Sequence, residues 1–345
     1  MEVKSDGIIL MTAKIEILLK DAQHIPAEFY HLKHVAHRIE TDQEAIEIAK
    51  TLAQRFQVEA GIRDHERRLP LEEIEAYSQS GLWGINIPKE YGGAGVSYKT
   101  LGEVVKIISS ADSSLGQVAQ NHWAFIEHIR LDATEDQKKF FFEQILNGHR
   151  LGNAFSEKHS KTVAELTTTI EFHENHAIIQ GEKFFATGAL LAHWIPVVAV
   201  NQDGQPFAAL VPQHSQGLTI INDWSGFGQR TTASGSVKLN QVKIDLDYVV
   251  PIHKAFERPT AAGAISQFIQ SAVDAGIARG AIQETIEYVR QYTRPWIDSG
   301  LNKATEDPYT IANIGELKIK LRAAEAVLDL AGLAIDAALS DPTEE

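Results

Sequence analysis

The 345-residue sequence contains no cysteine, only two methionines and no long apolar run. The absence of cysteine excludes disulfides, thiolate metal sites and a cysteine nucleophile, and it fits a reducing compartment. No stretch approaches the roughly 20 consecutive apolar residues of a membrane-spanning helix. The short apolar run within residues 1–11 lacks the basic leader of a signal peptide. These absences favour a soluble cytoplasmic protein.

Positive charge is also scarce: 32 Lys and Arg stand against 46 Asp and Glu, for a net charge of −14. Nucleic acid and anionic membranes attract basic surfaces, so we expect neither as a partner. The GxxxxGK[ST] pattern is missing, and GFGQRT at Gly226 keeps only the first two glycines of GxGxxG. His173 and His176 fall in a predicted turn, so we expect no metal site.

The hydrophobic periodicity changes twice along the chain. Thr41 and Glu44 form a capping box before apolar residues at helical spacing. After Leu151 the stretches are rich in β-branched and aromatic residues separated by turns, and helical spacing returns at Ala261. We therefore predict an α+β multidomain fold with a central antiparallel β-barrel. The predicted segments are an N-terminal extension (1–34), a helical domain (35–150), a β-barrel domain (151–255), to which the family resemblance described below assigns ligand binding, and a truncated C-terminal helical domain (256–345).

The C-terminal segment holds two long predicted helices, each with an apolar face. Two such helices form half of a bundle. Either another chain completes the bundle or the sequence is incomplete, and both interpretations stay open.

Five stretches, in order, resemble the acyl-CoA dehydrogenase superfamily, whose members also run from a helical domain through a β domain to a helical bundle. The segment AHRIETDQEA, which begins at Ala36, further resembles sulfur-acquisition oxidoreductases of the SfnB type. Their near relatives are flavin-dependent monooxygenases that oxidise dibenzothiophene. The five stretches are GLWGINIPKEYGGAG (81–95), NAFSE (153–157), GEKFFATGA (181–189), GFGQRTTASGSVKLNQVKI (226–244) and AGIARGAIQETIEYVRQYTRPW (275–296).

The resemblance implies a flavin-dependent oxidoreductase of one of two kinds. An FAD-dependent acyl-CoA dehydrogenase needs a carboxylate base. In the matching helix, residues 268–271 include no carboxylate, and Asp274 lies on a different helical face. We therefore favour a two-component monooxygenase that uses reduced FMN from a separate flavin reductase and acts on a small organosulfur or apolar substrate. An FAD-dependent dehydrogenase and an inactive truncated homologue remain the alternatives.

A monooxygenase must keep water away from a reactive flavin–oxygen species and hold it with neutral hydrogen-bond donors. The resemblance to the monooxygenase branch suggests Asn121 and Ser156 for this role, and Tyr98 as a proton donor. The alternative roles are that Ser156 caps a turn and that Asn121 satisfies buried backbone groups.

Further positions follow from the same resemblance. Tyr292 stands where FAD-using members carry an arginine, and Arg294 before Pro-Trp resembles a phosphate ligand, which favours FMN over FAD. Alternatively, Arg294 bonds the carbonyl groups at the helix end. The implied flavin contacts are Phe155, Ser156, Phe185, Thr187 and Arg294. The implied substrate pocket contains His122, Trp123, Trp194 and Phe227, although large aromatic residues are more often core residues. The superfamily also implies a homotetramer.

Overall fold

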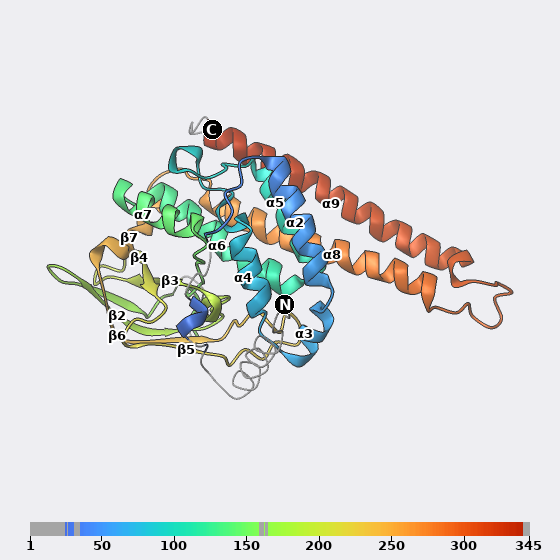
Figure 1. Ribbon diagram of the computed structural model, residues 1–345, viewed down its shortest axis with the longest axis horizontal. Coiled ribbons are helices and arrows are strands. Elements are labelled where there is room, and N and C mark those ends of the chain that lie inside the picture. The colour runs from blue at the N-terminus through green and yellow to red at the C-terminus, as the bar shows by residue number, and fades with distance from the viewer. Residues whose placement is uncertain (1–24, 26, 31–34, 159–161, 163–164, 341–345) are drawn as a thin grey trace, which may run out of the picture. The chain divides into compact units, whose positions relative to one another are not determined.

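The structure is a computed structural model that describes residues 25, 27–30, 35–158, 162 and 165–340 (Figure 1). Within them the chain forms two compact units. Unit 1 combines the described residues up to Val35 with Arg63–Leu71 and His149–His253. Unit 2 combines Ala36–Ile62 and Glu72–Gly148 with the chain from Lys254 onward. The N-terminal and C-terminal helices thus share one unit, while the four-segment division drawn from the sequence stays a prediction.

Unit 2 is helical, and side chains at the helix starts explain where its helices begin. Thr41 Oγ1 accepts a hydrogen bond from Glu44 N (3.2 Å), as the capping box predicted. Ser97, Asp112 and Thr134 cap three later helices in the same way. The helices of the described chain are α2 (Asp42–Gln57), α3 (Ala60–Glu66, shared between the units), α4 (Leu71–Gln79), α5 (Tyr98–Ala111), α6 (Ser113–Asp132), α7 (Glu135–Leu146), α8 (Ala262–Gln291) and α9 (Pro308–Ser340).

Helices α5 and α8 of unit 2 approach each other closely. A Cβ atom added at Gly276 would lie 2.6 Å from Lys106 O, and one added at Gly280 would lie 2.4 Å from Ser110 O. Only glycine permits this approach of a helix to a neighbouring backbone. Gly276 thus has a packing role in the structure.

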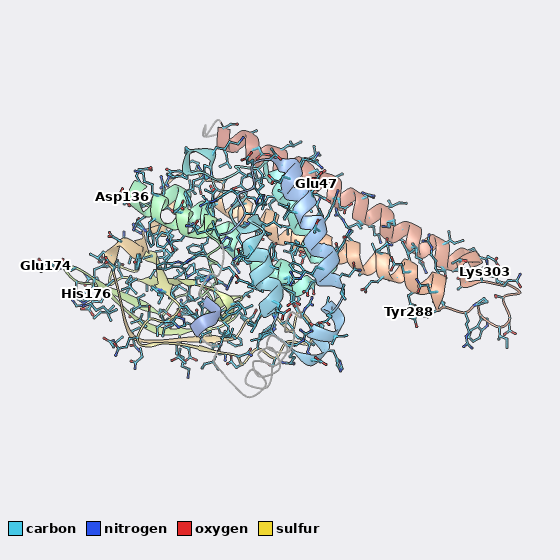
Figure 2. The ribbon with its side chains drawn as sticks, in the orientation of Figure 1. Glu47, Asp136, Glu174, His176, Tyr288 and Lys303 are labelled. Carbon is cyan, nitrogen blue, oxygen red and sulfur yellow. The ribbon has the colours of Figure 1, made fainter. Side chains whose placement is uncertain are left out.

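The long helices α8 and α9 lie side by side, as the sequence predicted (Figure 1). Arg279 of α8 bridges them: its guanidinium bonds Glu325 of α9 at 2.7 Å and Glu103 of α5 at 2.8 and 3.1 Å. Tyr288 and Lys303 mark the end of the pair where the loop joins the two helices (Figure 2). Among the described residues, no helix is long and apolar enough to cross a membrane.

Unit 1 contains one sheet, whose strand order in the described chain is β5-β6-β2-β1-β3-β4-β7. β1 pairs in parallel with β3, and the other neighbours are antiparallel. The predicted β-rich middle of the chain is confirmed, but the sheet is open where we expected a closed barrel. A barrel requires its two end strands to pair, and here β5 and β7 remain edges. The strands are β1 (Thr169–Phe172), β2 (Ala177–Lys183), β3 (Trp194–Val200), β4 (Pro206–Pro212), β5 (Leu218–Ile221), β6 (Ser236–Ile244) and β7 (Val249–Val250).

Seven short 3-10 helices connect these elements in the described chain. They are η1 (Ala27–Tyr30), η2 (Leu82–Gly84), η3 (Lys89–Tyr91), η4 (Ala189–Leu191), η5 (Leu246–Tyr248), η6 (Ile252–Phe256) and η7 (Ala304–Glu306).

Candidate functional site

Three segments of unit 1 that are distant in sequence meet just beyond the end of β2. Phe184 N donates to Ser156 O at 2.8 Å, so the residues after β2 run beside the NAFSE segment. Ala186 N donates to Gly235 O at 3.1 Å, which brings in a third segment before β6. The two stretches expected to bind flavin, NAFSE and GEKFFATGA, therefore form one surface. The segments cover residues 153–158, 183–188 and 232–235.

Phe185 stands out on this surface. Its φ angle is +52°, in the left-handed region that non-glycine residues rarely adopt. Phe185 is nevertheless 52% exposed, and Phe155, on the neighbouring NAFSE segment, is 36% exposed. Core packing therefore does not explain the strained backbone at Phe185. Such strain clusters at binding sites, and an exposed aromatic face there suits a flat aromatic ligand.

The Thr187 hydroxyl is held by a chain of hydroxyl groups. Thr232 Oγ1 donates to Gln229 O at 3.1 Å, and Ser234 Oγ lies 2.7 Å from Thr232 Oγ1 and 2.8 Å from Thr187 Oγ1. Either hydroxyl of the Thr187–Ser234 pair can donate, and Thr187 Oγ1 also lies within 3.5 Å of Phe185 O, to which it can donate its proton. In each arrangement the Thr187 oxygen keeps at least one lone pair for an N–H or O–H group of a ligand. Sequence reasoning identified Thr187 but missed Thr232 and Ser234, which come from another segment.

Trp194 and Phe227 were both predicted to line a substrate pocket. Both lie in unit 1, but they differ in solvent exposure. Trp194 is 8% exposed, and its Nε1 donates to His149 Nδ1 at 3.2 Å. Phe227 is fully exposed on the loop before β6. Trp194 is thus a core side chain of unit 1, and the pocket role of both residues stays a prediction.

Two histidines beside Trp194, the half-buried His149 and the buried His193, make the stability of unit 1 sensitive to acid. The rings of His149 and His193 stack at 4.5 Å. Burial, and then the charge of Arg150, lowers the pKa of His149 to about 4 and lowers the pKa of His193 well below its usual value. An unfolded histidine has a pKa of about 6.5, so the unfolded chain takes up protons first as the pH falls. The contribution of the two neutral histidines to the free energy of unfolding is therefore fully present above about pH 6.5. It is lost as the pH falls towards about 4.

We expect His149→Gln to make the pH dependence of unfolding shallower. Glutamine keeps an acceptor for Trp194 Nε1 but does not titrate. The check is the urea midpoint of unfolding at intervals between pH 4 and pH 7. An exposed histidine such as His173 serves as the control, since His173→Gln should leave the slope unchanged. A His149→Gln profile that matches the wild-type profile would contradict the assignment.

In unit 2, the predicted residues on α6 lie mainly in the helical core. His122 Nε2 lies 2.8 Å from Trp83 O, and Trp123 Nε1 donates to Leu82 O at 3.1 Å. Both side chains are 0% exposed, whereas Asn121 is half-buried. Core packing thus occupies His122 and Trp123, and the roles suggested for the three residues stay predictions.

Tyr98 begins α5 and is also buried, at 6% exposure. Its ring meets Phe268 edge-on at 6.4 Å. Burial, and then the nearby Glu127 carboxylate, raises the pKa of the Tyr98 hydroxyl. The hydroxyl therefore stays protonated at neutral pH and can donate a hydrogen bond, but it gives up its proton less readily than an ordinary tyrosine. The role of Tyr98 as a proton donor stays a prediction.

Arg294 follows the end of α8 and is exposed. Helix α8 ends with backbone bonds from Tyr292 N (2.8 Å) and Thr293 N (3.3 Å) to Tyr288 O. No hydrogen bond or ion pair found among the described residues involves Arg294, so its guanidinium does not bond the carbonyl groups at the helix end there. The phosphate role of Arg294 stays a prediction.

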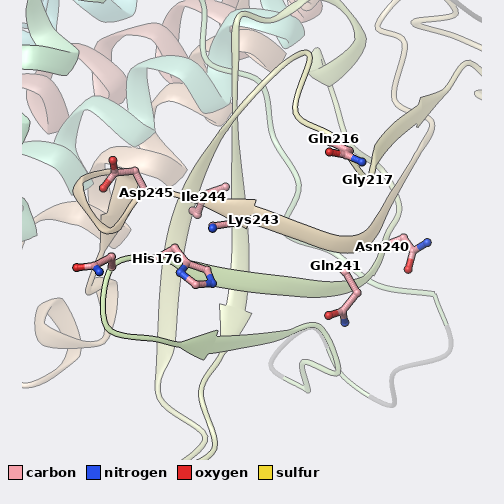
Figure 3. A pocket seen from close by; sticks show the side chains of 9 residues that line it. His176, Gln216, Gly217, Asn240, Gln241, Lys243, Ile244 and Asp245 are labelled. Carbon is pink, nitrogen blue, oxygen red and sulfur yellow. The ribbon is translucent and has the colours of Figure 1, made fainter.

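A surface depression of about 770 Å³ also lies in unit 1 (Figure 3). None of the residues predicted for the flavin or the substrate lines it, and its lining is polar and open. We therefore do not place the cofactor there. Over the described residues, no cluster of three or more metal-ligating side chains is present. The depression is lined by Asn175, His176, Gln216, Gly217, Asn240, Gln241, Lys243, Ile244 and Asp245.

Family models for the acyl-CoA dehydrogenase N-terminal and C-terminal domains match residues 40–149 and 268–344. A dibenzothiophene monooxygenase of Rhodococcus qingshengii is 34% identical over 307 residues, which cover 85% of this chain and 74% of the relative. The chain belongs to the acyl-CoA dehydrogenase family. The predicted superfamily and its monooxygenase branch are confirmed.

Two further relatives lie in the same branch. A probable FMNH2-dependent monooxygenase, SfnC of Pseudomonas putida, is 30% identical over 299 residues, which cover 85% of this chain and 74% of SfnC. The crystal structure of FMN-bound TdsC from a Paenibacillus species superposes with a TM-score of 0.79 at 34% identity, and the match covers 84% of this chain and 76% of TdsC. These similarities confirm the predicted fold.

Proposed function

We propose that this member of the family is a two-component monooxygenase that uses reduced FMN to oxygenate a small organosulfur or related apolar compound. The observation that carries the proposal is the 34% identity to the dibenzothiophene monooxygenase, together with the fold match to FMN-bound TdsC. The conversion of a sulfide, O2 and reduced FMN into a sulfoxide, water and oxidised FMN balances in atoms and electrons.

We place the protein in the cytoplasm, where a separate flavin reductase supplies reduced FMN.

The surface beyond β2 fits a flavin. A flavin combines a flat aromatic ring system with a polar edge, and the exposed ring of Phe185 lies beside the half-buried hydroxyl groups of Thr187 and Ser156. In our proposal, Phe155 and Phe185 contact the ring system, and Ser156 and Thr187 bond its polar edge. Bound FMN would supply the electrons that activate O2, and Arg294 would hold its single phosphate group as a cation.

The first test is a fluorescence titration of FMN and of FAD into the wild type and Arg294→Ala. A charge-assisted hydrogen bond contributes about 1.5–3 kcal/mol, so we expect the Kd of FMN to rise about 10-fold to 100-fold in the variant. Arg290→Ala, an exposed arginine near the end of α8, is the matched control and should leave the Kd unchanged. If the protein instead binds FAD more tightly than FMN, and Arg294→Ala leaves the Kd of FAD unchanged, the result would favour an acyl-CoA dehydrogenase.

We further infer that the protein is a homo-oligomer, with the tetramer as the expected form. Helix α9 leaves a series of large apolar side chains exposed along its length, and such faces are normally covered. A second copy of the chain would cover them. Analytical ultracentrifugation measures the assembly. The exposed residues on α9 are Tyr309, Ile311, Leu317, Ile319, Val327, Leu330 and Leu333.

A further inference from the structure

A buried ion pair lies directly behind the candidate flavin surface. Lys183 is the last residue of β2, and its Nζ lies 2.7 Å from Glu157 Oε1. The side chains of Lys183 and Glu157 are 0% and 2% exposed. Neither residue was selected from the sequence, because 26 positions separate them and no local pattern predicts their contact.

The pair connects three segments of unit 1. Lys183 Nζ also donates to Phe155 O at 3.1 Å. The Glu157 carboxylate accepts hydrogen bonds from Thr167 N (2.7 Å), Thr167 Oγ1 (2.6 Å) and Thr168 N (3.0 Å). Burial alone would raise the pKa of Glu157, but these bonds and Lys183 outweigh it and lower the pKa to about 2. Glu157 is therefore charged at neutral pH. Burial lowers the pKa of Lys183, and the hydrogen bond and charge of Glu157 act against that shift.

Hydrogen bonds from Lys183 and from the residue after it hold the backbone of Phe155 and Ser156, which our proposal assigns to flavin binding. Lys183 binds the carbonyl of Phe155, and the next residue, Phe184, donates to the carbonyl of Ser156. Residues 155–157 are thus fixed against the chain that leads into the strained Phe185. A shift at the ion pair would move both sides of the flavin surface together.

Stability alone does not account for such a pair. Taking two charges out of water costs several kcal/mol, and uncharged replacements of similar volume are often neutral or stabilising. We propose that Lys183 and Glu157 act as a positioning pair that holds Phe155 and Ser156 in the geometry needed for flavin binding. This inference rests on the proposed FMN site.

The test is a neutral double variant, Glu157→Gln/Lys183→Met. Glutamine keeps one acceptor oxygen, which can serve the Thr167 amide or the Thr168 amide but not both, since the carboxylate uses Oε2 for the first and Oε1 for the second. Methionine keeps most of the buried volume, so no unpaired charge remains. The control is Glu182→Gln/Lys238→Met, which neutralises an exposed cross-strand pair on β2 and β6. Urea unfolding, FMN titration and hydrogen exchange of the flavin-free protein are measured for each variant.

We expect the neutral variant to unfold near the wild-type midpoint but to bind FMN at least about tenfold more weakly. Its Phe184 and Ala186 amides should exchange at least about tenfold faster. The exposed control should match the wild type in all three measurements. Wild-type exchange rates and wild-type FMN affinity in the neutral variant would overturn the inference. A large loss of overall stability would also overturn it, since the pair would then be a stability element.

Hydrogen exchange separates this inference from the proposed function. If the wild-type protein binds no FMN, the proposed function fails on that result. Faster exchange at Phe184 and Ala186 would still show that the pair orders the surface, and unchanged exchange would reject the positioning role.

Discussion

Changing Tyr98 to phenylalanine is expected to slow oxygenation of the sulfur substrate by about 100-fold, within the range for loss of a general acid. The ring of Tyr98 is buried, so the substitution removes only the hydroxyl group. Burial and the nearby Glu127 carboxylate raise the pKa of that hydroxyl, so it stays protonated and can donate a hydrogen bond, but it is a weaker acid than an ordinary tyrosine. The measurement is kcat for product formation with a flavin reductase and O2, and the Kd of FMN should stay within about twofold.

Tyr77→Phe is the matched control for Tyr98→Phe. Tyr77 is a fully buried tyrosine of unit 2, and its hydroxyl has no hydrogen-bond partner among the described residues. Its loss should leave kcat unchanged. Equal rates for Tyr98→Phe and the wild type would remove Tyr98 from the proposed chemistry.

Replacing Gly276 with alanine is expected to destabilise unit 2 by about 3 kcal/mol, at the upper end of the cost of overpacking a core. The added Cβ would lie 2.6 Å from Lys106 O and 2.7 Å from Ser109 Cβ. Backbone cannot rotate away as a long side chain can, so α5 and α8 must separate. The check is the shift of the urea midpoint at constant m-value.

The same helix provides the control for this substitution. Gly263 also lies in α8, and a Cβ added there meets no atom within 4 Å. Gly263→Ala should therefore be neutral or stabilising by up to about 1 kcal/mol, because alanine favours helix. Similar losses at the two positions would show that α5 and α8 do not approach as closely as described.

Local signals in the sequence predicted the helices well. The cap at Thr41 lies within four residues of the groups that it satisfies, so it can be read directly from the sequence. Sheet closure could not be predicted in this way, because whether β5 meets β7 depends on stagger accumulated over the whole sheet. The strands themselves were visible from their composition, but their pairing partners were not.

The candidate site was predictable only where a motif marked it. NAFSE and GEKFFATGA pointed to Ser156, Phe185 and Thr187, and the structure brings these residues together. The supporting groups were missed, because the Lys183–Glu157 bond and the Ser234 hydroxyl act across long sequence separations. On α6, helical spacing could not separate a pocket-lining residue from a core residue, and His122 proved to be bonded to the backbone at Trp83.

We propose that this protein transfers an oxygen atom from O2 with electrons from reduced FMN. The most direct measurement supplies purified protein with dibenzothiophene, FMN, NADH, a flavin reductase and 18O2, and analyses the product by mass spectrometry. We expect a sulfoxide that carries one 18O atom and forms only when O2, FMN and the protein are all present. Absence of labelled sulfoxide, together with flavin bleaching by an acyl-CoA without O2, would contradict the monooxygenase proposal and identify a dehydrogenase.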